Sequence, residues 1–270
     1  MTKKILIQIY SDIHIELWNK LPKLPVKADY LFLAGDICSL NNELFYNFFD
    51  YCSSNWKKTF FTPGNHEFYS KKRNYNELEF EYKFRLSEKY KNVFYLNDSF
   101  VQLNENINVY GSVFWTKPPF KSTLEAKLCI NDYNWITYYN KSRNRVVDLD
   151  ILYVNELSKN AYNNLQTYLN DTTDKITIIM THFPPFRNEA VDPKYLIKKG
   201  ISDLYFTWPD KTIEHFNLVN VPLWISGHTH WSYNFNNNGC QFISNQVGYS
   251  NEIFKTGLNE DGLYEIELEE

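Results

Sequence analysis

Short apolar runs alternate with polar segments along the chain, and five of these runs end directly before a group of polar residues. Their length and their content of β-branched and aromatic residues predict β-strands. The five runs are residues 5–10, 30–34, 59–62, 176–180 and 222–226. A helical pattern connects the second run to the third, at residues 40–55. Such strand–helix–strand units build a largely parallel sheet, so the sequence predicts an α/β fold.

Two further stretches have the periodicity of amphipathic helices. In residues 76–91 apolar side chains recur at every fourth position from Leu78 to Tyr90, and residues 150–169 have a similar apolar face. We expect each helix to cover one face of a sheet. Additional strands are predicted at residues 93–96, 100–103, 107–114, 241–244 and 263–268.

Residues 117–148 are the least regular part of the sequence, polar with scattered aromatic side chains. A loop of this length in a compact domain is often a lid or a binding segment, so we expect it to recognise the substrate. No repeat, linker or charge block divides the chain. Its 270 residues, 43% of them hydrophobic, are enough for one sizeable core. We expect residues 1–270 to form a single domain.

Charge and hydropathy exclude several classes of protein. The net charge of −4 argues against broad electrostatic attraction to nucleic acid. No apolar stretch reaches the roughly 18 residues of a membrane helix, and residues 5–10 are too short for the core of a signal peptide. We therefore expect a cytoplasmic protein with no membrane partner. The cysteines are far apart and are predicted to be reduced, buried thiols: Cys38, Cys52, Cys129 and Cys240.

Basic and aromatic residues give weaker signals. We interpret two basic groups as solvated surface in preference to a phosphate-binding rim; they are Lys117, Lys121, Lys127, Lys141, Arg143 and Arg145, and Lys194, Lys198 and Lys199. Six aromatic residues near the polar motifs are expected to serve packing in preference to stacking on a nucleobase. They are Phe68, Tyr69, Phe183, Phe186, Trp231 and Tyr233.

The polar motifs that follow the first five predicted strands contain five of the six histidines. They are Asp12-Ile13-His14, Gly35-Asp36, Gly64-Asn65-His66-Glu67, Thr181-His182 and Gly227-His228-Thr229-His230. Open α/β sheets place their ligand sites at the carboxyl ends of strands, where these motifs fall. Carboxylate oxygens and neutral imidazoles suit Mn, Fe, Zn, Co or Ni, and the absence of thiolates argues against a structural zinc site. The sequence therefore predicts a catalytic metal centre.

Within this centre the side chains have different expected roles. Residues two apart in an extended segment share a face, so Asp12 and His14 are expected to reach one ion. Asp36 is placed to bridge two ions, because a carboxylate can give one oxygen to each and so offset their repulsion. Asn65 contributes a neutral amide oxygen, which leaves the metals more electrophilic than another carboxylate would.

In their order, the motifs D-x-H, G-D, G-N-H-E, H and G-H-x-H resemble those of the calcineurin-like metallophosphoesterase superfamily. The resemblance spans residues 12–230 and implies an α/β sandwich of two mixed β-sheets flanked by helices. It also implies two divalent ions, with manganese preferred over iron, zinc, nickel or magnesium. By this resemblance the first ion binds Asp12, His14, Asp36 and His230, and the second binds Asp36, Asn65, His182 and His228.

The resemblance also implies the reaction. A hydroxide that bridges the two ions attacks the phosphorus of a phosphomonoester or phosphodiester. By the same resemblance His66 stands beside the metals. It either protonates the leaving oxygen, which we favour, or stabilises the phosphoryl group. Asp36 or another carboxylate orients the His66 ring. Glu67 either supports a ligand imidazole or is purely structural. We expect a small phosphorylated or nucleotide-like substrate, with nucleic acid less favoured.

One bacterial-type branch of the superfamily is more similar than the others. It carries S-D-x-H-x-E, G-N-H-E-F-Y, W-T and N-D, which appear here at residues 11–16, 64–69, 115–116 and 131–132. That branch commonly ends with N-P-R-G-Y, where this chain has Asn245-Gln246-Val247-Gly248-Tyr249. The arginine of that loop is therefore absent.

Other classes fit the sequence less well. Protein serine/threonine phosphatases carry two phosphate-gripping arginines that are missing here, one of them at the position of Pro63. Purple acid phosphatases need a tyrosine ligand where this chain has Ser39. The DNA-repair nucleases usually read G-N-H-D and add a capping domain, so a nuclease is the second hypothesis. A catalytically inactive protein-binding scaffold is the third; such scaffolds usually lose ligands, and here none is missing.

Overall fold

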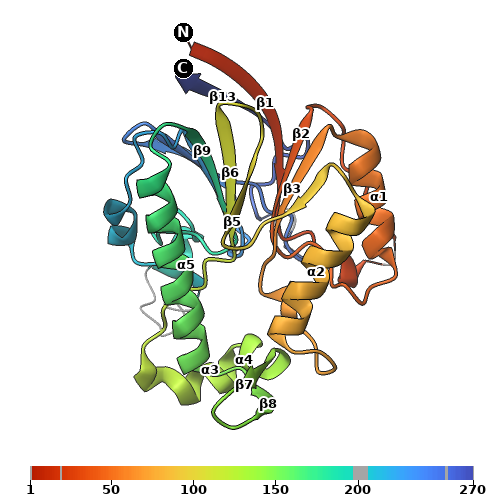
Figure 1. Cartoon of the computed structure of the whole chain (residues 1–270), viewed down its shortest axis with the longest axis vertical. Helices are drawn as coiled ribbons and strands as arrows, with labels where there is room; N and C mark the ends of the chain where they lie inside the picture. The colour runs from red at the N-terminus through yellow and green to blue at the C-terminus, as the bar shows by residue number, and fades with distance from the viewer. Residues whose placement is uncertain (1, 19, 197–205, 253–254, 270) are drawn as a thin grey trace.

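Two mixed β-sheets lie face to face in the middle of the protein, and helices cover their outer faces (Figure 1). The computed structural model describes residues 2–18, 20–196, 206–252 and 255–269. The first strand pairs with the last, so the two ends of the described chain lie side by side. The predicted α/β sandwich of two mixed sheets flanked by helices is confirmed.

The first sheet has the strand order β13-β1-β2-β3-β4, in which only β13 is antiparallel to its neighbour. Its strands are β1 (Thr2–Tyr10), β2 (Tyr30–Ala34), β3 (Lys58–Thr62), β4 (Val93–Tyr95) and β13 (Leu263–Glu269). All five were predicted, with ends that differ by a few residues.

The second sheet has the order β11-β12-β10-β9-β6-β5, with antiparallel edge strands on a parallel centre. Its strands are β5 (Ser99–Gln102), β6 (Ile107–Ser112), β9 (Ile176–Thr181), β10 (Leu223–Ile225), β11 (Tyr233–Asn237) and β12 (Cys240–Ser244). The sequence did not predict β11. Three of its residues are asparagines, which obscure the alternation that is typical of a strand. An edge strand tolerates them because one of its sides faces solvent.

Helices α1 (Leu44–Asn55) and α2 (Tyr75–Lys89) cover the first sheet, and α5 (Ile151–Asp171) covers the second (Figure 1). The side chain of Asn74 caps α2 while Glu77 bonds back to the Asn74 backbone, which is a complete capping box. Asp150 caps α5 by accepting the Tyr153 N–H. The three predicted helices are confirmed, although α1 begins later than the pattern suggested.

Alternation along the strands divides the core into layers. In β2, Leu31 and Leu33 pack against the helices, whereas Phe32 and Ala34 face the second sheet. All four side chains are fully buried. A strand that is apolar on both faces is typical of a parallel sheet that is covered on both sides. Packing between the layers fixes the positions of the strand ends and therefore the positions of the loops that carry the polar motifs.

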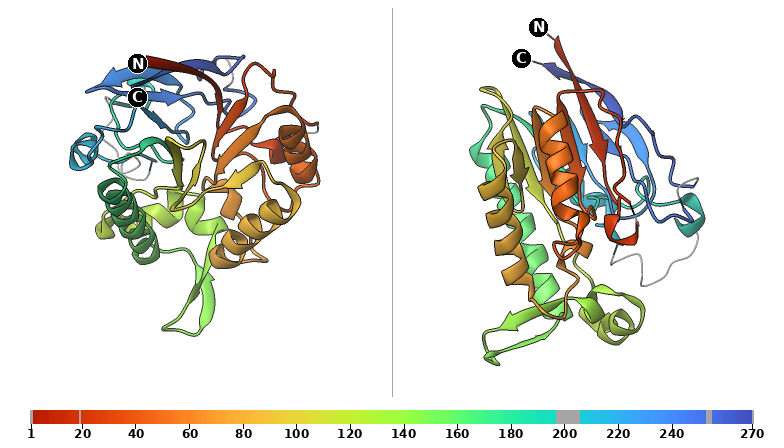
Figure 2. Two further views of the ribbon diagram at one scale, coloured as in Figure 1. Left: turned by 45° about the horizontal axis from the view of Figure 1, so that its top comes forward. Right: turned by 90° about the vertical axis from the view of Figure 1, so that its right-hand side faces the viewer.

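Residues 117–148 are not the irregular loop that we expected. After a 3-10 turn at Phe120–Ser122 they form α3 (Thr123–Cys129), α4 (Asp132–Trp135) and a hairpin of β7 (Thr137–Asn140) with β8 (Arg145–Asp148). This segment projects from the end of the molecule opposite the chain termini (Figure 2). These elements were not predicted from the sequence because each is too short to show a periodicity of its own.

The remaining expectations have mixed outcomes. Cys38, Cys52 and Cys240 are buried and free as predicted, but Cys129 is exposed, so that part of the prediction is wrong. Lys198 and Lys199 lie outside the described residues, whereas Lys194 pairs with Asp192 at the surface. Among the described residues, no helix combines the length and the apolar character required to cross a bilayer.

Gln8 is a fully buried polar residue on β1 that joins three parts of the fold. Its Nε2 donates to the carbonyls of Pro25 at 2.7 Å and Asp261 at 2.8 Å. Its Oε1 accepts the Trp56 indole N–H at 2.9 Å and two backbone N–H groups, the nearer one, of Lys27, at 2.8 Å. Each buried polar group that loses its hydrogen-bond partner lowers the free energy of unfolding by about 1–3 kcal/mol.

We therefore expect Gln8→Leu to lower the free energy of unfolding by at least about 3 kcal/mol, because several buried polar groups lose their partner at once. Urea unfolding monitored by circular dichroism measures the change. Leu6→Gln, on the same strand but 47% exposed, is the control and should change the free energy by less than about 1 kcal/mol. An equal effect of the two substitutions would contradict the role of Gln8.

Candidate metal centre

The loops after five strands meet at one end of the two sheets and bring the predicted metal ligands together. The loops after β1, β2 and β3 of the first sheet carry Asp12, His14, Asp36 and Asn65. The loops after β9 and β10 of the second sheet carry His182, His228 and His230. Their carboxylate and imidazole atoms, with those of His66, form three groups, each with its atoms within 4.8 Å of one another: Asp12/His14/His230, His14/Asp36/His66 and Asp36/His182/His228.

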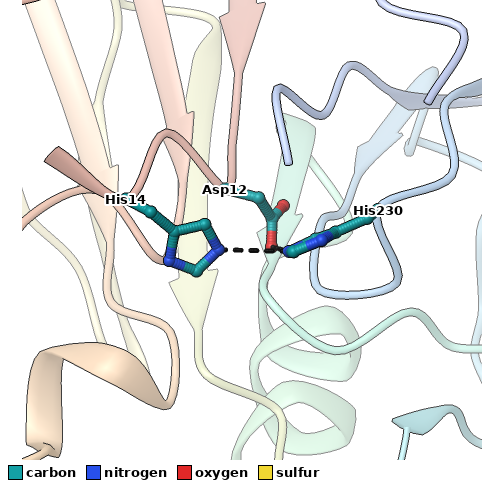
Figure 3. Close-up of side chains that lie close together, drawn as sticks. All are labelled: Asp12, His14 and His230. Carbon is teal, nitrogen blue, oxygen red and sulfur yellow. Dashed lines mark hydrogen bonds and ion pairs between the residues drawn. The ribbon is translucent and has the colours of Figure 1, made fainter. Parts of the chain in front are cut away.

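The first group joins β1 to the loop after β10. Figure 3 shows Asp12, His14 and His230 directed toward one another. Nε2 of His14 lies 3.1 Å from Nε2 of His230, which in turn lies 3.6 Å from Oδ1 of Asp12. Asp12 also accepts the backbone N–H of His228 at 3.0 Å, which ties this loop to β1.

The second group lies on the other side of Asp36. Nε2 of His182 is 3.2 Å from Nδ1 of His228, 3.0 Å from Oδ1 of Asn65 and 3.5 Å from Oδ1 of Asp36. His182 and Asp36 are buried, and Asn65 is nearly so. Four donor atoms from both sheets thus surround one small volume.

The Asp36 carboxylate lies between the two groups. Its Oδ1 faces His182 at 3.5 Å, whereas its Oδ2 faces His14 at 4.0 Å and His66 at 3.9 Å. The side chain is buried. One carboxylate oxygen is therefore directed at each histidine group, as a bridging ligand requires.

The spacing of the ring nitrogens fits a shared ion. Two ligand atoms at about 2.1 Å from one metal are about 3.0 Å apart at a right angle and about 3.4 Å apart at the tetrahedral angle. The separations of 3.1 Å between His14 and His230 and 3.2 Å between His182 and His228 lie inside this interval. Nδ1 of His228 is the nitrogen that faces His182, whereas its Nε2 is buried and has no hydrogen-bond partner among the described residues.

Hydrogen bonds at Nδ1 fix the tautomers of three of these histidines. Nδ1 of His182 lies 2.9 Å from the Ala34 carbonyl, to which it donates. Nδ1 of His230 lies 2.6 Å from Glu252, and Nδ1 of His14 lies 3.3 Å from Glu16. When Nδ1 carries the proton, Nε2 is the free base that binds a metal.

The backbone at these ligands is strained. Five non-glycine residues of the site adopt the left-handed conformation, with φ between 50° and 77°: Asp12, His14, Asp36, His228 and His230. Each such residue costs about 1–3 kcal/mol and persists only where the surroundings enforce it. Strain of this kind gathers at functional sites, and here it turns side chains of the strand ends toward one point.

Two glycines make room for the donor atoms. Gly35 has φ of 87°, and a Cβ there would lie 2.3 Å from Nδ1 of His182. At Gly64 a Cβ would lie 2.2 Å from Oδ1 of Asp36. The glycine in each of these motifs is therefore required by the close approach of the neighbouring ligand.

Glu67 holds the loops that carry Asp36 and Asn65. Its buried carboxylate accepts the backbone N–H groups of Asp36 at 2.9 Å, Ile37 at 2.8 Å and Gly64 at 2.5 Å. Burial, followed by the charge of Asp36, raises its pKa to about 7. Among the described residues its carboxylate bonds to backbone N–H groups and not to a histidine ring, so of the two expected roles the structural one agrees with the geometry.

Burial and charge compete across the centre. Burial disfavours the charged form of His182, but Asp36 and Asp12 outweigh it and raise its pKa to about 9. Burial also opposes the charge of Asp36, yet the histidines around it hold its pKa well below the ordinary value. For His228, burial and the neighbouring His182 together lower the pKa well below its ordinary value.

His66 lies at the open side of the centre. Its Nδ1 is 3.2 Å from the Glu16 carboxylate, its Nε2 is 3.5 Å from the Tyr249 hydroxyl, and its ring stacks on Tyr69 with centroids 4.3 Å apart. Burial lowers its pKa, but Asp36 and Glu16 outweigh this and raise it to about 9. Two carboxylates can orient the ring: Glu16 lies within hydrogen-bond distance of Nδ1, and Asp36 lies 3.9 Å from Nε2 and accepts the backbone N–H of His66 at 2.9 Å.

The projecting segment reaches the centre through α4. Asp132 accepts a hydrogen bond from Nδ2 of Asn65 at 2.7 Å and another from the Tyr69 hydroxyl at 2.7 Å. The N-D and G-N-H-E-F-Y motifs are therefore parts of one network. The sequence showed both motifs but not that they touch.

The final loop supports the last two histidines without an arginine. Gln246 accepts the backbone N–H of His230 and donates to Thr229 at 3.1 Å and to the carbonyl of Trp231 at 2.9 Å. Val247, where the bacterial-type branch has arginine, is buried. Through Gln246 this loop positions the segment from Thr229 to Trp231.

A cavity of about 610 Å³ opens beside the centre. Of the six aromatic residues expected to serve packing, only Tyr69 lines it; Phe68, Phe183 and Phe186 are buried. The cavity is also lined by Glu252, Tyr195 and Phe206, which were not predicted because they lie outside any motif. His215, the sixth histidine, lies outside the motifs and is exposed on a 3-10 helix.

Comparison with known proteins identifies the family and the fold of the chain. The chain belongs to the calcineurin-like phosphoesterase family, which it matches over residues 6–232. It is 25% identical over 269 residues to "Uncharacterized protein L509" of Acanthamoeba polyphaga mimivirus, with 92% of each chain covered. The phosphopantetheinyl hydrolase of Mycobacterium tuberculosis has the same fold, with a TM-score of 0.69 at 16% identity over 96% of this chain and 94% of that one. The family resemblance is confirmed, whereas the bacterial-type branch stays a prediction.

Metal affinity should depend on pH, because a metal competes with the proton that His182 carries below its pKa of about 9. We expect affinity to fall about tenfold per pH unit as the pH is lowered from 9 to 7, and to level off above pH 9. Chelator competition with Mn²⁺ at several pH values measures the slope. A constant affinity over this interval would contradict the assignment of His182.

Proposed function

We propose that the protein is a phosphoesterase that uses two divalent metal ions to hydrolyse a phosphomonoester or a phosphodiester. The proposal rests on membership of the phosphoesterase family and on one geometric observation: the two oxygens of Asp36 face two separate histidine groups. The ions, when bound, would activate water as a nucleophile and neutralise the oxygens of the phosphate.

The proposed ligand sets follow the two groups. The first ion would be held by Asp12, His14, Asp36 and His230, and the second by Asp36, Asn65, His182 and His228. These donors are imidazole nitrogens and neutral or charged oxygens, which suit manganese, our first choice, and also iron, zinc or nickel. Magnesium prefers oxygen ligands alone and fits this set less well.

We assign the proton donor to His66. Its pKa of about 9 keeps it protonated at neutral pH in the metal-free protein, and its Nε2 lies beside Asp36 at the open side of the centre. Glu16 holds the ring at Nδ1 and Tyr69 stacks on one face. A fixed imidazolium beside the reacting phosphate would protonate the leaving oxygen.

A small substrate is preferred over nucleic acid. Apart from the proposed metal ligands and His66, the charged residues that line the cavity among the described residues are Asp132, Asp192, Glu252 and Arg187. Carboxylates outnumber cations there, and a polyanion needs the opposite balance. A single domain over residues 1–270 and a cytoplasmic location stay predictions.

A substrate and metal panel tests the proposal. Metal-stripped protein receives Mn²⁺, Ni²⁺, Mg²⁺ or Zn²⁺ and is assayed with p-nitrophenyl phosphate, bis(p-nitrophenyl) phosphate and a cyclic nucleotide. We expect no turnover without metal and turnover with at least Mn²⁺, and the better substrate decides between monoester and diester. Silence with every metal would overturn the proposal and favour the inactive scaffold.

Substitutions separate proton donation from metal binding. We expect His66→Ala to keep both ions but to lose about a hundredfold to ten-thousandfold in rate, which is the usual effect of a lost proton donor. Asp36→Ala should lose metal together with activity. Elemental analysis and kinetics measure the two effects, and His215→Ala, at an exposed histidine, is the control. Normal metal content and activity in both variants would refute these roles.

A further inference from the structure

A groove of about 600 Å³ lies at the projecting end of the molecule and shares no lining residue with the cavity beside the proposed metal centre. Its walls come from the 3-10 turn and α3, from the β7–β8 hairpin and from the start of α5 (Figure 1). The described residues that line it all lie between positions 120 and 152. The groove is therefore a second concave surface, with no part in the proposed hydrolysis.

Strand β8 runs along this groove with a free edge. All four of its residues, Arg145–Asp148, line the groove. Because successive side chains of a strand point to opposite faces, a groove lined by every residue follows an edge of the strand and not one face. One edge of β8 pairs with β7, and no third strand joins this sheet among the described residues. The other edge therefore offers backbone N–H and C=O groups to an added strand.

Three apolar side chains beside this strand are open to solvent. Phe120 is 65% exposed, Val146 is 51% exposed and Leu152 is 64% exposed, and all three line the groove. They come from three different walls: the 3-10 turn, β8 and α5. Exposed apolar groups that gather in one concave surface indicate a site that a partner covers.

The groove also has an excess of positive charge. Its two carboxylates have partners of their own, since Asp148 pairs with Lys71 at 3.0 Å and Asp150 accepts the Tyr153 N–H at 2.9 Å. Three cations of the lining form no ion pair within the described part of the chain; they are Lys127, Arg143 and Arg145. A groove of this charge is complementary to an acidic ligand, although the whole chain has a net charge of −4.

We propose that this groove binds an extended acidic segment of a partner protein, which adds to β8 as a third strand. In this mode of recognition the backbone of the segment supplies hydrogen bonds, and its side chains supply specificity. Apolar side chains of the segment contact Phe120, Val146 and Leu152, and its carboxylates face the three cations. The inference goes beyond the proposed function and does not depend on it, because none of the proposed metal ligands lines the groove.

Other occupants fit the groove less well. A second copy of this chain, paired edge to edge through β8, would bring the same cations against one another. A single-stranded nucleic acid needs several aromatic rings on which its bases stack, and Phe120 is the one aromatic residue among the described lining residues. A bilayer surface offers no strand to pair with the free edge.

Four fluorescein-labelled decapeptides test the three features separately, by fluorescence anisotropy with the whole protein at about 0.15 M salt. The peptide (Glu-Val)5 combines acidic charge, apolar side chains and a free backbone. In (Lys-Val)5 the charge is reversed, in (Glu-Gly)5 the apolar side chains are missing, and in (Glu-Val)5 methylated at every backbone nitrogen the N–H donors are missing. We expect (Glu-Val)5 to bind at least tenfold more tightly than each of the other three.

Variants assign the binding to the groove. Arg145→Glu and Phe120→Ala should each weaken the binding of (Glu-Val)5 at least fivefold. The matched controls lie outside the groove: Lys83→Glu, at an exposed lysine of α2, and Val219→Ala, at an apolar residue that is 87% exposed. Both should leave the affinity unchanged. Thermal unfolding of every variant verifies that it is folded.

Equal affinities for (Glu-Val)5 and (Glu-Gly)5 would overturn the inference, because they would show a general attraction of acidic peptides to the cations. Equal weakening by the control variants would also overturn it. A twenty-residue thymidine oligonucleotide that binds as tightly as (Glu-Val)5 would assign the groove to nucleic acid instead. Self-association of the protein in analytical ultracentrifugation that is abolished by Arg145→Glu would assign it to a second copy.

Discussion

The site depends on one buried carboxylate that must not be left without positive partners. Asp36 is almost completely buried, and an unpaired charge in such a place costs several kcal/mol. His182, His66 and His14 surround it and hold its pKa well below the usual range. Because these histidines come from different loops and from both sheets, the charge balance around Asp36 also fixes how the sheets meet at this end. The rest of the centre is arranged around that requirement.

The strain in the ligand loops is offset by polar side chains that are not ligands themselves. Glu67 accepts backbone N–H groups from the loops after β2 and β3. In the loop after β10, Gln246 accepts the His230 N–H and donates to the Trp231 carbonyl. Both residues are buried, so their hydrogen bonds are made in a low dielectric and are correspondingly strong. The ordered strands supply fixed starting points, and these two side chains hold the left-handed turns that follow. Donor atoms are thereby brought to short separations before any ligand binds.

The sequence predicted those parts of the molecule that have a strong local pattern. The apolar strands, the three long helices and the family motifs each appear within a short window, so fold class and family were correct. Residues 117–148 were misjudged because α3, α4 and the hairpin are too short for a periodicity to emerge. The contacts of Glu252 with His230 and of Asp132 with Asn65 join residues far apart in the chain. Contacts of this kind cannot be predicted from a local sequence pattern. The same holds for the exposure of Tyr195 and Phe206 in one cavity.

The contact between α4 and Asn65 links the lining of the cavity to the proposed metal centre. An amide has a donor end and an acceptor end, and only its oxygen is able to serve a cation. Asp132 accepts from Nδ2 of Asn65 at 2.7 Å, and the Asn65 oxygen therefore turns toward His182, 3.0 Å away. Without that carboxylate, rotation of the amide by half a turn would direct N–H groups at the donor cluster. Since Asp132 and its neighbour Asn131 also line the cavity, the same short segment that lines the cavity sets the orientation of a proposed ligand.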